Sequence, residues 1–347
     1  MKKLICSAVA GAVMAMTSVT GASAAENARL KMGSTFPGGL VQLGTLGKEL
    51  EGNINAMAGD RIKIKFYEPG ALVPALELFD AVKSGAVDAG WSAPGYWQGK
   101  EPAVTLFTTV PFGPSAGEYL GWMYYGGGEE MMQELYARHN IHTMVCGIIA
   151  PEASGWFRKP IDSVADLKGL KMRFFGLGAK VMQKLGVDTQ LLAAADIYPA
   201  LERGTIDATE FSMPAIDLKL GFYQIAKHYY FPGWHQQSTL LEMMINMDKW
   251  NAMDAQQQKI ITTACRANVA TGLAEGEALQ AKALKELVGH GVTLHKWSDA
   301  DLAVFEEKWN EVAAEQAAKN EDFARIWKSM QDYRKEYKLW KDYGFLK

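Results

Sequence analysis

The sequence predicts an α/β protein folded into two lobes, and three observations support this prediction. Residues 29–33 and 62–67 alternate apolar and polar side chains as half-buried strands do, with a helical pattern over 40–57 between them. The chain has 347 residues, which is more than one hydrophobic core usually serves. A segment that reads as a helix, a glycine and a strand occurs twice. Strand, helix and strand at this spacing favour a mainly parallel sheet with helices on its faces.

The first residues have the pattern of a secretory signal peptide. Lys2 and Lys3 precede an apolar run over residues 4–16, and the small residues Ala22-Ser23-Ala24 follow it. The run is shorter than the ~20 apolar residues that a membrane-spanning helix needs. We therefore expect residues 1–24 to be cleaved off and the mature protein to reside in the periplasm.

Charge and cysteine content limit the partners and the covalent cross-links that we expect for this protein. The full chain has a formal net charge of −3, and loss of the two lysines of the predicted signal peptide makes the mature protein more acidic. No basic run with interleaved aromatic residues occurs, so nucleic acid is not an expected partner. Cys146 and Cys265 would lie in a compartment that permits disulfides. They either form a bridge or remain two buried thiols, and we expect the thiols.

The repeated segment predicts where a ligand binds. Residues 81–89 and 200–208 both read as the end of a helix, a glycine, two residues of which the second is apolar, and the pair Asp-Ala. Gly85 and Gly204 supply the left-handed residue that ends each helix. The last side chains of the short strand that follows lie at a sheet edge, where open α/β sheets bind ligands. One such segment in each lobe predicts a cleft between the lobes, with chance agreement of a common helix-stop signal as the alternative.

The rest of the chain completes the predicted organisation. We place the first lobe mainly in residues 25–150, the second mainly in 151–250, and helices that span both lobes in 251–347. A helix begins at Ser298, with Asp301 as its partner in a capping box. A face this rich in large apolar residues packs either on the chain's own two lobes or on a second copy in a homodimer. Those residues recur at Leu302, Phe305, Trp309, Val312, Phe323, Ile326, Trp327, Met330, Tyr337 and Trp340.

Arg173 is the first candidate binding residue. It lies in the apolar strand predicted over 170–175, shortly before a helix that opens with Gly176. A guanidinium group offers two parallel donors, which match a carboxylate better than the point charge of lysine does. Considered alone, the residues leave a structural salt bridge and the carboxylate of a ligand as equally good partners for Arg173.

The motifs of common enzymes are missing from the sequence. The glycines at 126–128 have no Lys-Ser or Lys-Thr behind them, and no serine stands in a Gly-x-Ser-x-Gly turn. His139 and His142 have no further cluster of ligands to complete a zinc site. We therefore expect that the protein is not an enzyme. The remaining enzyme hypothesis is acid/base chemistry by Glu152 and Glu210.

A succession of motifs in fixed order occupies the middle of the chain. They are Trp156-Phe157-Arg158-Lys159-Pro160, Leu167-Lys168-Gly169-Leu170-Lys171-Met172-Arg173, Gly204-Thr205-Ile206-Asp207-Ala208-Thr209-Glu210-Phe211, Leu220-Gly221-Phe222-Tyr223 and Tyr229-Tyr230-Phe231-Pro232-Gly233-Trp234-His235. This order resembles the DctP-type solute-binding proteins of tripartite ATP-independent periplasmic (TRAP) transporters, and among them the branch that binds 2-oxo acids and lactate.

The resemblance implies a fold and a function. The fold is that of a two-lobed periplasmic binding protein with a long C-terminal helix, which some relatives exchange in a dimer. The function is capture of a small organic acid, a 2-oxo or 2-hydroxy monocarboxylate, and its delivery to TRAP membrane subunits that use an ion gradient. A role in sensing with the same fold and pocket is an open alternative.

The resemblance also implies roles for individual residues. Arg173 would hold the carboxylate of the ligand, while Glu210 and the backbone oxygen of Phe211 would coordinate a cation beside it. Carboxylate and carbonyl oxygens suit hard cations such as Ca²⁺ or Na⁺. Phe211, which is also a candidate ligand contact, stands where the branch has tryptophan, so one N–H group of the usual pocket is absent.

Glu152 stands where the branch usually carries glutamine, and it is a candidate both for the ligand and for the cation. Two carboxylates close together raise the pKa of one of them unless a cation neutralises them. Glu152 therefore favours either a divalent ion such as Ca²⁺ or an amino-bearing ligand. Glu242, at the start of an apolar strand, is a weaker candidate metal ligand, and Gln236 replaces a frequent glutamate. Three aromatic residues of the first lobe are candidates for the pocket wall: Phe36, Tyr96 and Trp97.

Overall fold

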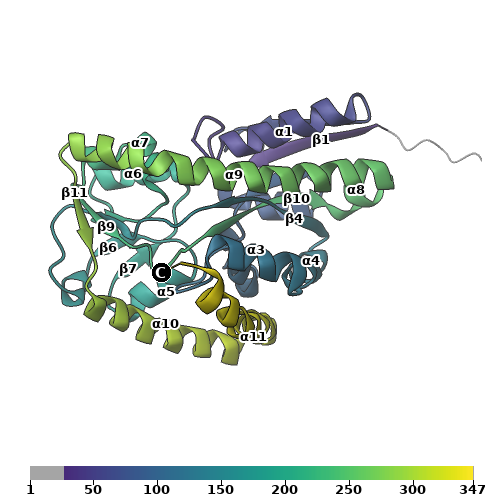
Figure 1. Ribbon diagram of the computed structural model, residues 1–347. Coiled ribbons are helices and arrows are strands. Elements are labelled where there is room, and N and C mark those ends of the chain that lie inside the picture. Colours follow the sequence, from purple (N-terminus) through teal and green to yellow (C-terminus); the bar gives the residue numbers. More distant parts are fainter. Residues whose placement is uncertain (1–26, 347) are drawn as a thin grey trace, which may run out of the picture.

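Two β-sheets, with helices around them and one long helix running along both, make up the structure, a computed structural model that describes residues 27–346 (Figure 1). The predicted signal peptide, residues 1–24, lies outside the described residues. Within residues 27–346, none of the helices combines the length and the apolar character that crossing a membrane requires.

The first sheet has the strand order β2-β1-β3-β10-β4. β1 runs parallel to β2 and to β3, whereas β10 runs antiparallel to β3 and to β4. In β2, buried Ile62 and Ile64 alternate with exposed Lys63 and Lys65, which confirms the alternating pattern read from the sequence. The strands are β1 (Ala28–Ser34), β2 (Ile62–Tyr67), β3 (Ala89–Ser92), β4 (Ile141–Ile149) and β10 (Thr239–Asn246).

The second sheet has the strand order β11-β9-β5-β8-β6-β7. β6 is parallel to β7 and β8, β9 is parallel to β11, and β5 is antiparallel to β8 and β9. The strands are β5 (Gly155–Phe157), β6 (Lys171–Arg173), β7 (Asp188–Gln190), β8 (Ala208–Thr209), β9 (His228–Phe231) and β11 (Thr293–Lys296).

Both sheets are mixed, so the prediction of a mainly parallel sheet holds only for part of each. The difference arises where the chain returns from one half of the molecule to the other. Residues 239–246 fall in the range expected for the second lobe, but as β10 they insert between β3 and β4 of the first sheet. A strand that enters from the opposite end of the sheet must pair antiparallel.

The helices cover the sheets and connect them. α9 contacts β4 and α1 on the first half and α7 on the second, and Figure 1 shows it running along both. It begins with a capping box between Asp254 and Gln257. The α-helices are α1 (Thr45–Ala58), α2 (Leu78–Lys83), α3 (Ala116–Tyr125), α4 (Gly128–Ala137), α5 (Gly176–Lys184), α6 (Ala194–Glu202), α7 (Pro214–Leu220), α8 (Met247–Asn251), α9 (Ala255–Gly289), α10 (Asp299–Lys319) and α11 (Glu321–Gly344). Short 3₁₀ helices are η1 (Ala75–Glu77), η2 (Pro94–Trp97), η3 (Pro102–Phe107), η4 (Val164–Leu167) and η5 (Phe222–Gln224).

The duplicated helix-stop segments have the expected conformation. Gly85 follows α2 with φ 76°, and Gly204 follows α6 with φ 72°, so both lie in the left-handed region that favours glycine. β3 and β8 come next in the chain. Ala93, directly after β3, and Phe211, the second residue after β8, both line the pocket described below.

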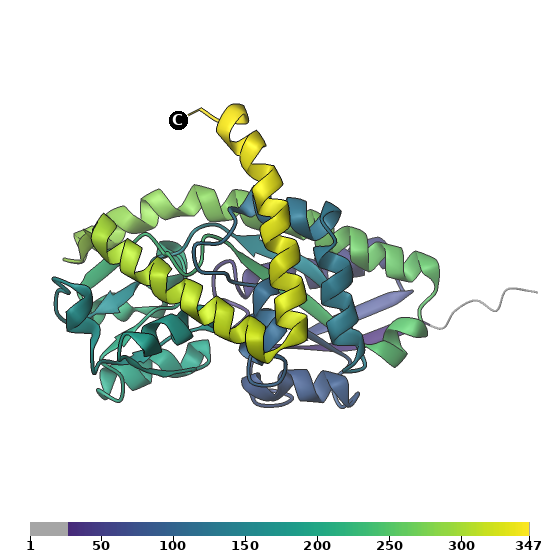
Figure 2. The same cartoon turned by 90° about the horizontal axis from the view of Figure 1, so that it is seen from below.

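The C-terminal region forms two helices rather than one. Asn320 ends α10 and begins α11, because its side chain accepts a hydrogen bond from the backbone N–H of Phe323. α10 contacts α5, whereas α11 contacts α3, α4 and η3, so the pair packs on both halves. The capping box predicted at Ser298 and Asp301 is present. Figure 2 shows the end of α11 projecting away from the rest of the molecule.

The expectation of two free thiols is wrong, because Cys146 and Cys265 form a disulfide. Cys146 lies in β4 and Cys265 in α9, and both are buried. The packing of α9 on β4 brings the two Cα atoms to 4.0 Å although the residues are 119 positions apart in the chain. That long-range contact is what the sequence did not reveal.

Candidate functional site

A small pocket lies between the two sheets. Its walls come from the ends and loops of strands in both halves, as the duplicated segments predicted. Residues of the first half that line it are Phe36, Leu43, Ala93, Tyr96, Ile149, Thr239 and Leu241; the others are Glu152, Arg173, Phe175, Phe211, Ser212 and Gln236. The space inside it is small, which limits the site to a small ligand.

Arg173 is the cationic side chain among the described residues that line this pocket. It ends β6, and only 1 % of it is exposed. Its Nη1 donates to both the backbone oxygen and Oε1 of Glu210, each at 2.8 Å, and its Nε donates to the backbone oxygen of Leu192 at 3.3 Å. The guanidinium also lies 5.0 Å from the centre of the Phe211 ring, within the range of a cation–π contact.

One carboxylate oxygen of Glu210 accepts hydrogen bonds from neighbouring groups, and the other accepts none from the described residues. Because Arg173 pairs with Thr209 in the sheet register, Glu210 follows β8 directly beside Arg173. Its Oε1 accepts from Arg173 and, at 2.5 Å, from the backbone N–H of Phe175 at the start of α5. Its Oε2 accepts no hydrogen bond from residues 27–346.

Glu152 has the same division of roles. Its Oε1 accepts from the hydroxyls of Ser212 at 3.2 Å and Thr239 at 3.1 Å. Its Oε2 is buried and has no donor in the described part of the chain. Burial raises the pKa of Glu152 well above its usual range, and the charges of Glu210 and Asp217 raise it further.

Gln236 was noted in the sequence but not chosen as a site residue, and the structure brings it into the pocket. Its backbone oxygen accepts from the N–H of Glu152, and its Nε2 donates to Thr239 at 2.7 Å. Its Oε1 is buried and lacks a hydrogen-bond partner within residues 27–346. Together with the free oxygens of Glu152 and Glu210 it gives three oxygens without a hydrogen-bond partner among the described residues, and such a group suits a hard cation when both carboxyls are ionised.

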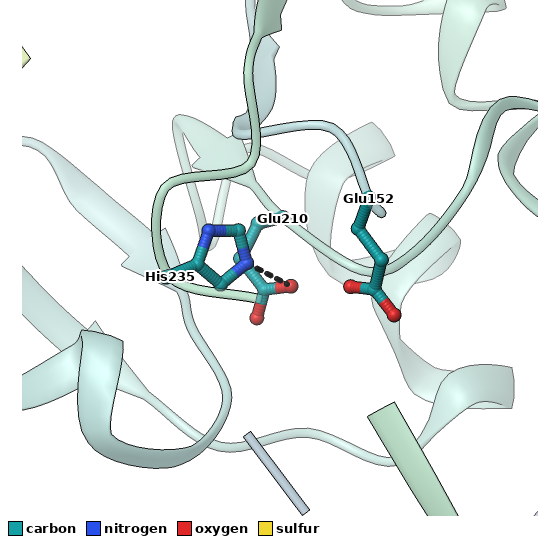
Figure 3. A group of neighbouring side chains, drawn as sticks. All are labelled: Glu152, Glu210 and His235. Carbon is teal, nitrogen blue, oxygen red and sulfur yellow. Dashed lines mark ion pairs between the residues drawn. The ribbon is translucent and has the colours of Figure 1, made fainter. Parts of the chain in front are cut away.

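His235 is a second residue that the sequence interpretation did not select. It is fully buried beside Gln236, and neither ring nitrogen makes a hydrogen bond to any described residue. Its Nε2 lies 3.5 Å from Glu210 Oε2. Ligand atoms of Glu152, Glu210 and His235 lie within 4.8 Å of one another, and Figure 3 shows the three side chains facing each other.

Aromatic side chains form one wall of the pocket. Phe36 and Tyr96, both expected from the sequence, line it together with Phe211 and with Phe175, which was not expected. The rings of Tyr96 and Phe175 meet edge to face at 4.8 Å, across the two halves of the molecule. Burial raises the pKa of Tyr96 to about 12 although the charge of Arg173 opposes this, so the hydroxyl is a neutral group close to the arginine.

Trp97 and Glu242 are not brought to the pocket and instead contact each other. Trp97 Nε1 donates to Glu242 Oε1 at 2.6 Å, and Thr143 Oγ1 donates to Glu242 Oε2 at 3.1 Å. Neither Trp97 nor Glu242 lines the pocket among the residues described. Glu242 lies inside β10, pointing away from the pocket, so both of its oxygens are used within the first half of the molecule. We do not retain either residue in the site.

Comparison with known proteins places the chain in a family. The family DctP, described as bacterial extracellular solute-binding protein, family 7, matches residues 32–320. The chain belongs to this family. A relative from Nostoc sp., a monocarboxylate 2-oxoacid-binding periplasmic protein, is 36 % identical over 341 residues, which cover 96 % of this chain and 93 % of that protein.

Solved structures of family members have the same fold. A TRAP transporter solute-binding protein from Bordetella bronchiseptica, a mixed-occupancy dimer with copurified calcium and picolinate, superposes with a TM-score of 0.89 at 33 % identity; the match covers 92 % of this chain and 95 % of that one. A TRAP solute-binding protein from Pseudoalteromonas atlantica with bound sodium and pyruvate gives a TM-score of 0.87 at 34 % identity, covering 92 % and 97 %. These matches confirm the two-sheet α/β fold and the DctP resemblance.

Family membership indicates the general role of this DctP protein. Members of the family are solute-binding receptors rather than enzymes, they bind small organic acids, and they work with TRAP membrane subunits. The structure from Bordetella bronchiseptica has calcium and picolinate in its active site, and that from Pseudoalteromonas atlantica has bound sodium and pyruvate, which is consistent with the expected Ca²⁺ or Na⁺.

The placement of Glu242 outside the pocket gives a test by pH. Burial raises the pKa of Glu242 to about 7, so ionising it costs free energy in the folded state only. The cost is absent below pH 4.5, the pKa of this carboxyl in the unfolded chain. It reaches its full value, about 3 kcal/mol of lost stability, above about pH 7, the pKa in the folded protein. We expect Glu242→Gln to raise the free energy of unfolding, relative to the wild type, more at about pH 8 than at about pH 5. Urea unfolding of both proteins at the two pH values checks this, and parallel pH profiles would contradict it.

Proposed function

We propose that this protein binds a small 2-oxo or 2-hydroxy monocarboxylate together with a cation, and delivers it to TRAP membrane subunits from the periplasm. The observation that carries the proposal is the set of three buried acceptor oxygens on Glu152, Glu210 and Gln236, next to the guanidinium of Arg173. Glu152 and Gln236 line the pocket, and a carboxylate oxygen of Glu210 lies within 4.8 Å of one of Glu152. Buried polar atoms in proteins nearly always have a partner, so these atoms indicate a bound group that satisfies them.

Arg173 is the group that we assign to the carboxylate of the ligand. Its Nη1 and Nε are engaged by Glu210 and Leu192, and the remainder of the guanidinium borders the pocket near the Tyr96 hydroxyl. A carboxylate placed there receives charge-assisted hydrogen bonds. Because Arg173 is the cationic residue of the described lining, the site suits one carboxylate rather than two.

Charge balance supports a divalent cation. Arg173 is already neutralised by Glu210, so a bound carboxylate and an ionised Glu152 add two negative charges in a buried place. A Ca²⁺ ion held by the free oxygens of Glu152, Glu210 and Gln236 balances them, whereas Na⁺ balances only one unless Glu152 is protonated. The backbone oxygen of Phe211 and an oxygen on the second carbon of the ligand would complete the coordination. Both cations occur with ligands in relatives, and we propose Ca²⁺ here.

The rest of the pocket selects for size. The pocket has aromatic walls, against which a short apolar substituent on the ligand would pack; they are formed by Phe36, Tyr96, Phe175 and Phe211. Glu152 and Glu210 have assigned binding roles, so we propose no acid/base chemistry for them and no enzymatic activity.

Side chains from both halves touch the ligand, so its binding favours a closed arrangement of the two halves that the membrane subunits recognise.

We also propose that two copies associate through the projecting end of α11. Leu339 is 69 % exposed, Trp340 59 % and Tyr343 84 %, and all three lie near the end of this helix. Large apolar side chains gathered on a projecting helix indicate a protein partner. The relative from Bordetella bronchiseptica is a dimer, which supports a second copy as that partner.

The role of Arg173 is tested by Arg173→Lys. Lysine keeps the charge, but its single ammonium group cannot reproduce the hydrogen bonds to Glu210 and Leu192 and also donate to the ligand, so we expect the affinity for pyruvate in the presence of Ca²⁺ to fall by ~10–150-fold. Isothermal titration calorimetry measures it. The matched control is Arg158→Lys, because Arg158 donates to the backbone oxygen of Leu201 outside this pocket. Equal affinities of the Arg173→Lys variant and the wild type would show that Arg173 does not bind the ligand.

The role of Glu152 is tested by Glu152→Gln, with pyruvate titrated into chelator-treated protein containing either Ca²⁺ or Na⁺. The substitution removes one negative charge facing the cation, so we expect pyruvate affinity with Ca²⁺ to fall by about tenfold or more while affinity with Na⁺ changes less. Glu242→Gln, a buried glutamate outside the pocket, is the control. Pyruvate binding that is insensitive to chelation would contradict the cation proposal. If only amino-bearing ligands stabilise the protein, its ligand is an amino-bearing compound and not a monocarboxylate.

The dimer is tested by the double substitution Leu339→Glu and Trp340→Glu. Two charges on the apolar face make its burial costly, so we expect a dimer in the wild type and a monomer in the variant by light scattering. Met57→Glu, on an exposed position of α1, is the control and should remain dimeric. A variant with the same mass in solution as the wild type would place the contact elsewhere.

A further inference from the structure

We propose that the cation position of this pocket also takes a first-row transition ion such as Zn²⁺ or Mn²⁺, with His235 as a ligand beside Glu152 and Glu210. This inference rests on the proposed function, because the 2-oxo acid would complete the coordination of the ion. It changes the class of metal that the receptor accepts, and it gives His235 a role that a calcium site does not require.

The environment of His235 is the first observation. The imidazole is fully buried, and neither nitrogen has a hydrogen-bond partner within residues 27–346. Its Nε2 lies 3.5 Å from Glu210 Oε2, but the two atoms do not form a hydrogen bond. Buried polar atoms without partners are rare in native proteins. The ring packs edge to face on Phe174 at 4.9 Å, which holds it toward the two glutamates.

The geometry of the three side chains is the second observation. One atom each of Glu152, Glu210 and His235 lies within 4.8 Å of the others (Figure 3). A zinc ion binds imidazole nitrogen and carboxylate oxygen at about 2.0–2.2 Å, so these atoms must move closer together to bind one ion. The free oxygens, Oε2 of Glu152 and of Glu210, are the ones available for it.

The kind of ligand decides the kind of metal. Calcium takes oxygen ligands, whereas an imidazole nitrogen with carboxylates suits zinc, iron, nickel and similar ions. Three protein ligands leave coordination positions open for an exchangeable group, as in other zinc sites. The carboxylate and the 2-oxo oxygen of pyruvate can occupy two of them. A divalent transition ion also provides the same charge balance against Arg173, Glu152 and Glu210 as Ca²⁺ does.

The experiment compares Zn²⁺ and Ca²⁺ on chelator-treated full-length mature protein in the presence of pyruvate. Isothermal titration calorimetry gives the affinity for each ion in the wild type and in His235→Phe, which keeps a ring but removes both nitrogens. We expect the ratio of zinc to calcium affinity to fall by about tenfold or more in His235→Phe. An unchanged ratio would overturn the inference.

The control variant is His295→Phe. His228 Nδ1 and His295 Nε2 are 2.9 Å apart at the edge of the second sheet, so this pair can take up zinc outside the pocket. We expect the ratio of zinc to calcium affinity to be retained in this variant. A loss of zinc affinity in His295→Phe, but not in His235→Phe, would assign the zinc to the surface pair and overturn the inference.

A measurement on the wild type keeps the inference testable if His235→Phe does not fold. Pulsed electron paramagnetic resonance of bound Mn²⁺ with pyruvate should show coupling to an imidazole ¹⁴N nucleus, and spectra without nitrogen coupling would exclude His235 as a ligand.

The proposed function and this inference can be contradicted independently of each other. Calcium-dependent pyruvate binding without zinc binding contradicts only this inference, whereas zinc-dependent binding without a calcium effect contradicts the choice of Ca²⁺.

Discussion

The buried ion pair between Arg173 and Glu210 is the interaction on which the site depends. Both side chains are almost fully buried, and removing one partner of such a pair leaves an uncompensated charge at a cost of about 3–5 kcal/mol. The pair is fixed by the backbone, because Arg173 ends β6 and Glu210 follows β8 in adjacent register. It commits Oε1 of Glu210 and one face of the guanidinium, and so determines what remains for a ligand and a cation.

The remaining groups in the pocket follow from that constraint. Oε2 of Glu210 has no donor among the described residues, and Glu152 and Gln236 each add another such oxygen from the loops that flank the second sheet. An anion on Arg173 alone would worsen the charge balance, whereas an anion with a cation restores it. Under the proposed function the protein binds two species together, and the ligand and the ion each strengthen the binding of the other.

The sequence predicts the parts of the site that regular structure places. Arg173 ends the short strand β6, and Glu210 and Phe211 follow β8. Gly85 and Gly204 mark the helix ends before β3 and β8, so these positions could be inferred from local patterns. His235 and Gln236 lie in an irregular segment between β9 and β10, where no periodicity points inward. Glu242, Trp97 and the disulfide depend on β10 and α9 packing against distant elements, which a local pattern does not reveal. The family resemblance supplied the function; the chemistry of the residues alone left Arg173 with two equal interpretations.

The most direct test of the central claim is a crystal structure of the protein grown with pyruvate and Ca²⁺. We predict the carboxylate of pyruvate on Arg173 and an ion in contact with the free oxygens of Glu152, Glu210 and Gln236, at distances of about 2.3–2.6 Å. Pyruvate bound on Arg173 with no ion, and with these oxygens hydrogen-bonded to water or to a protonated Glu152, would contradict the account.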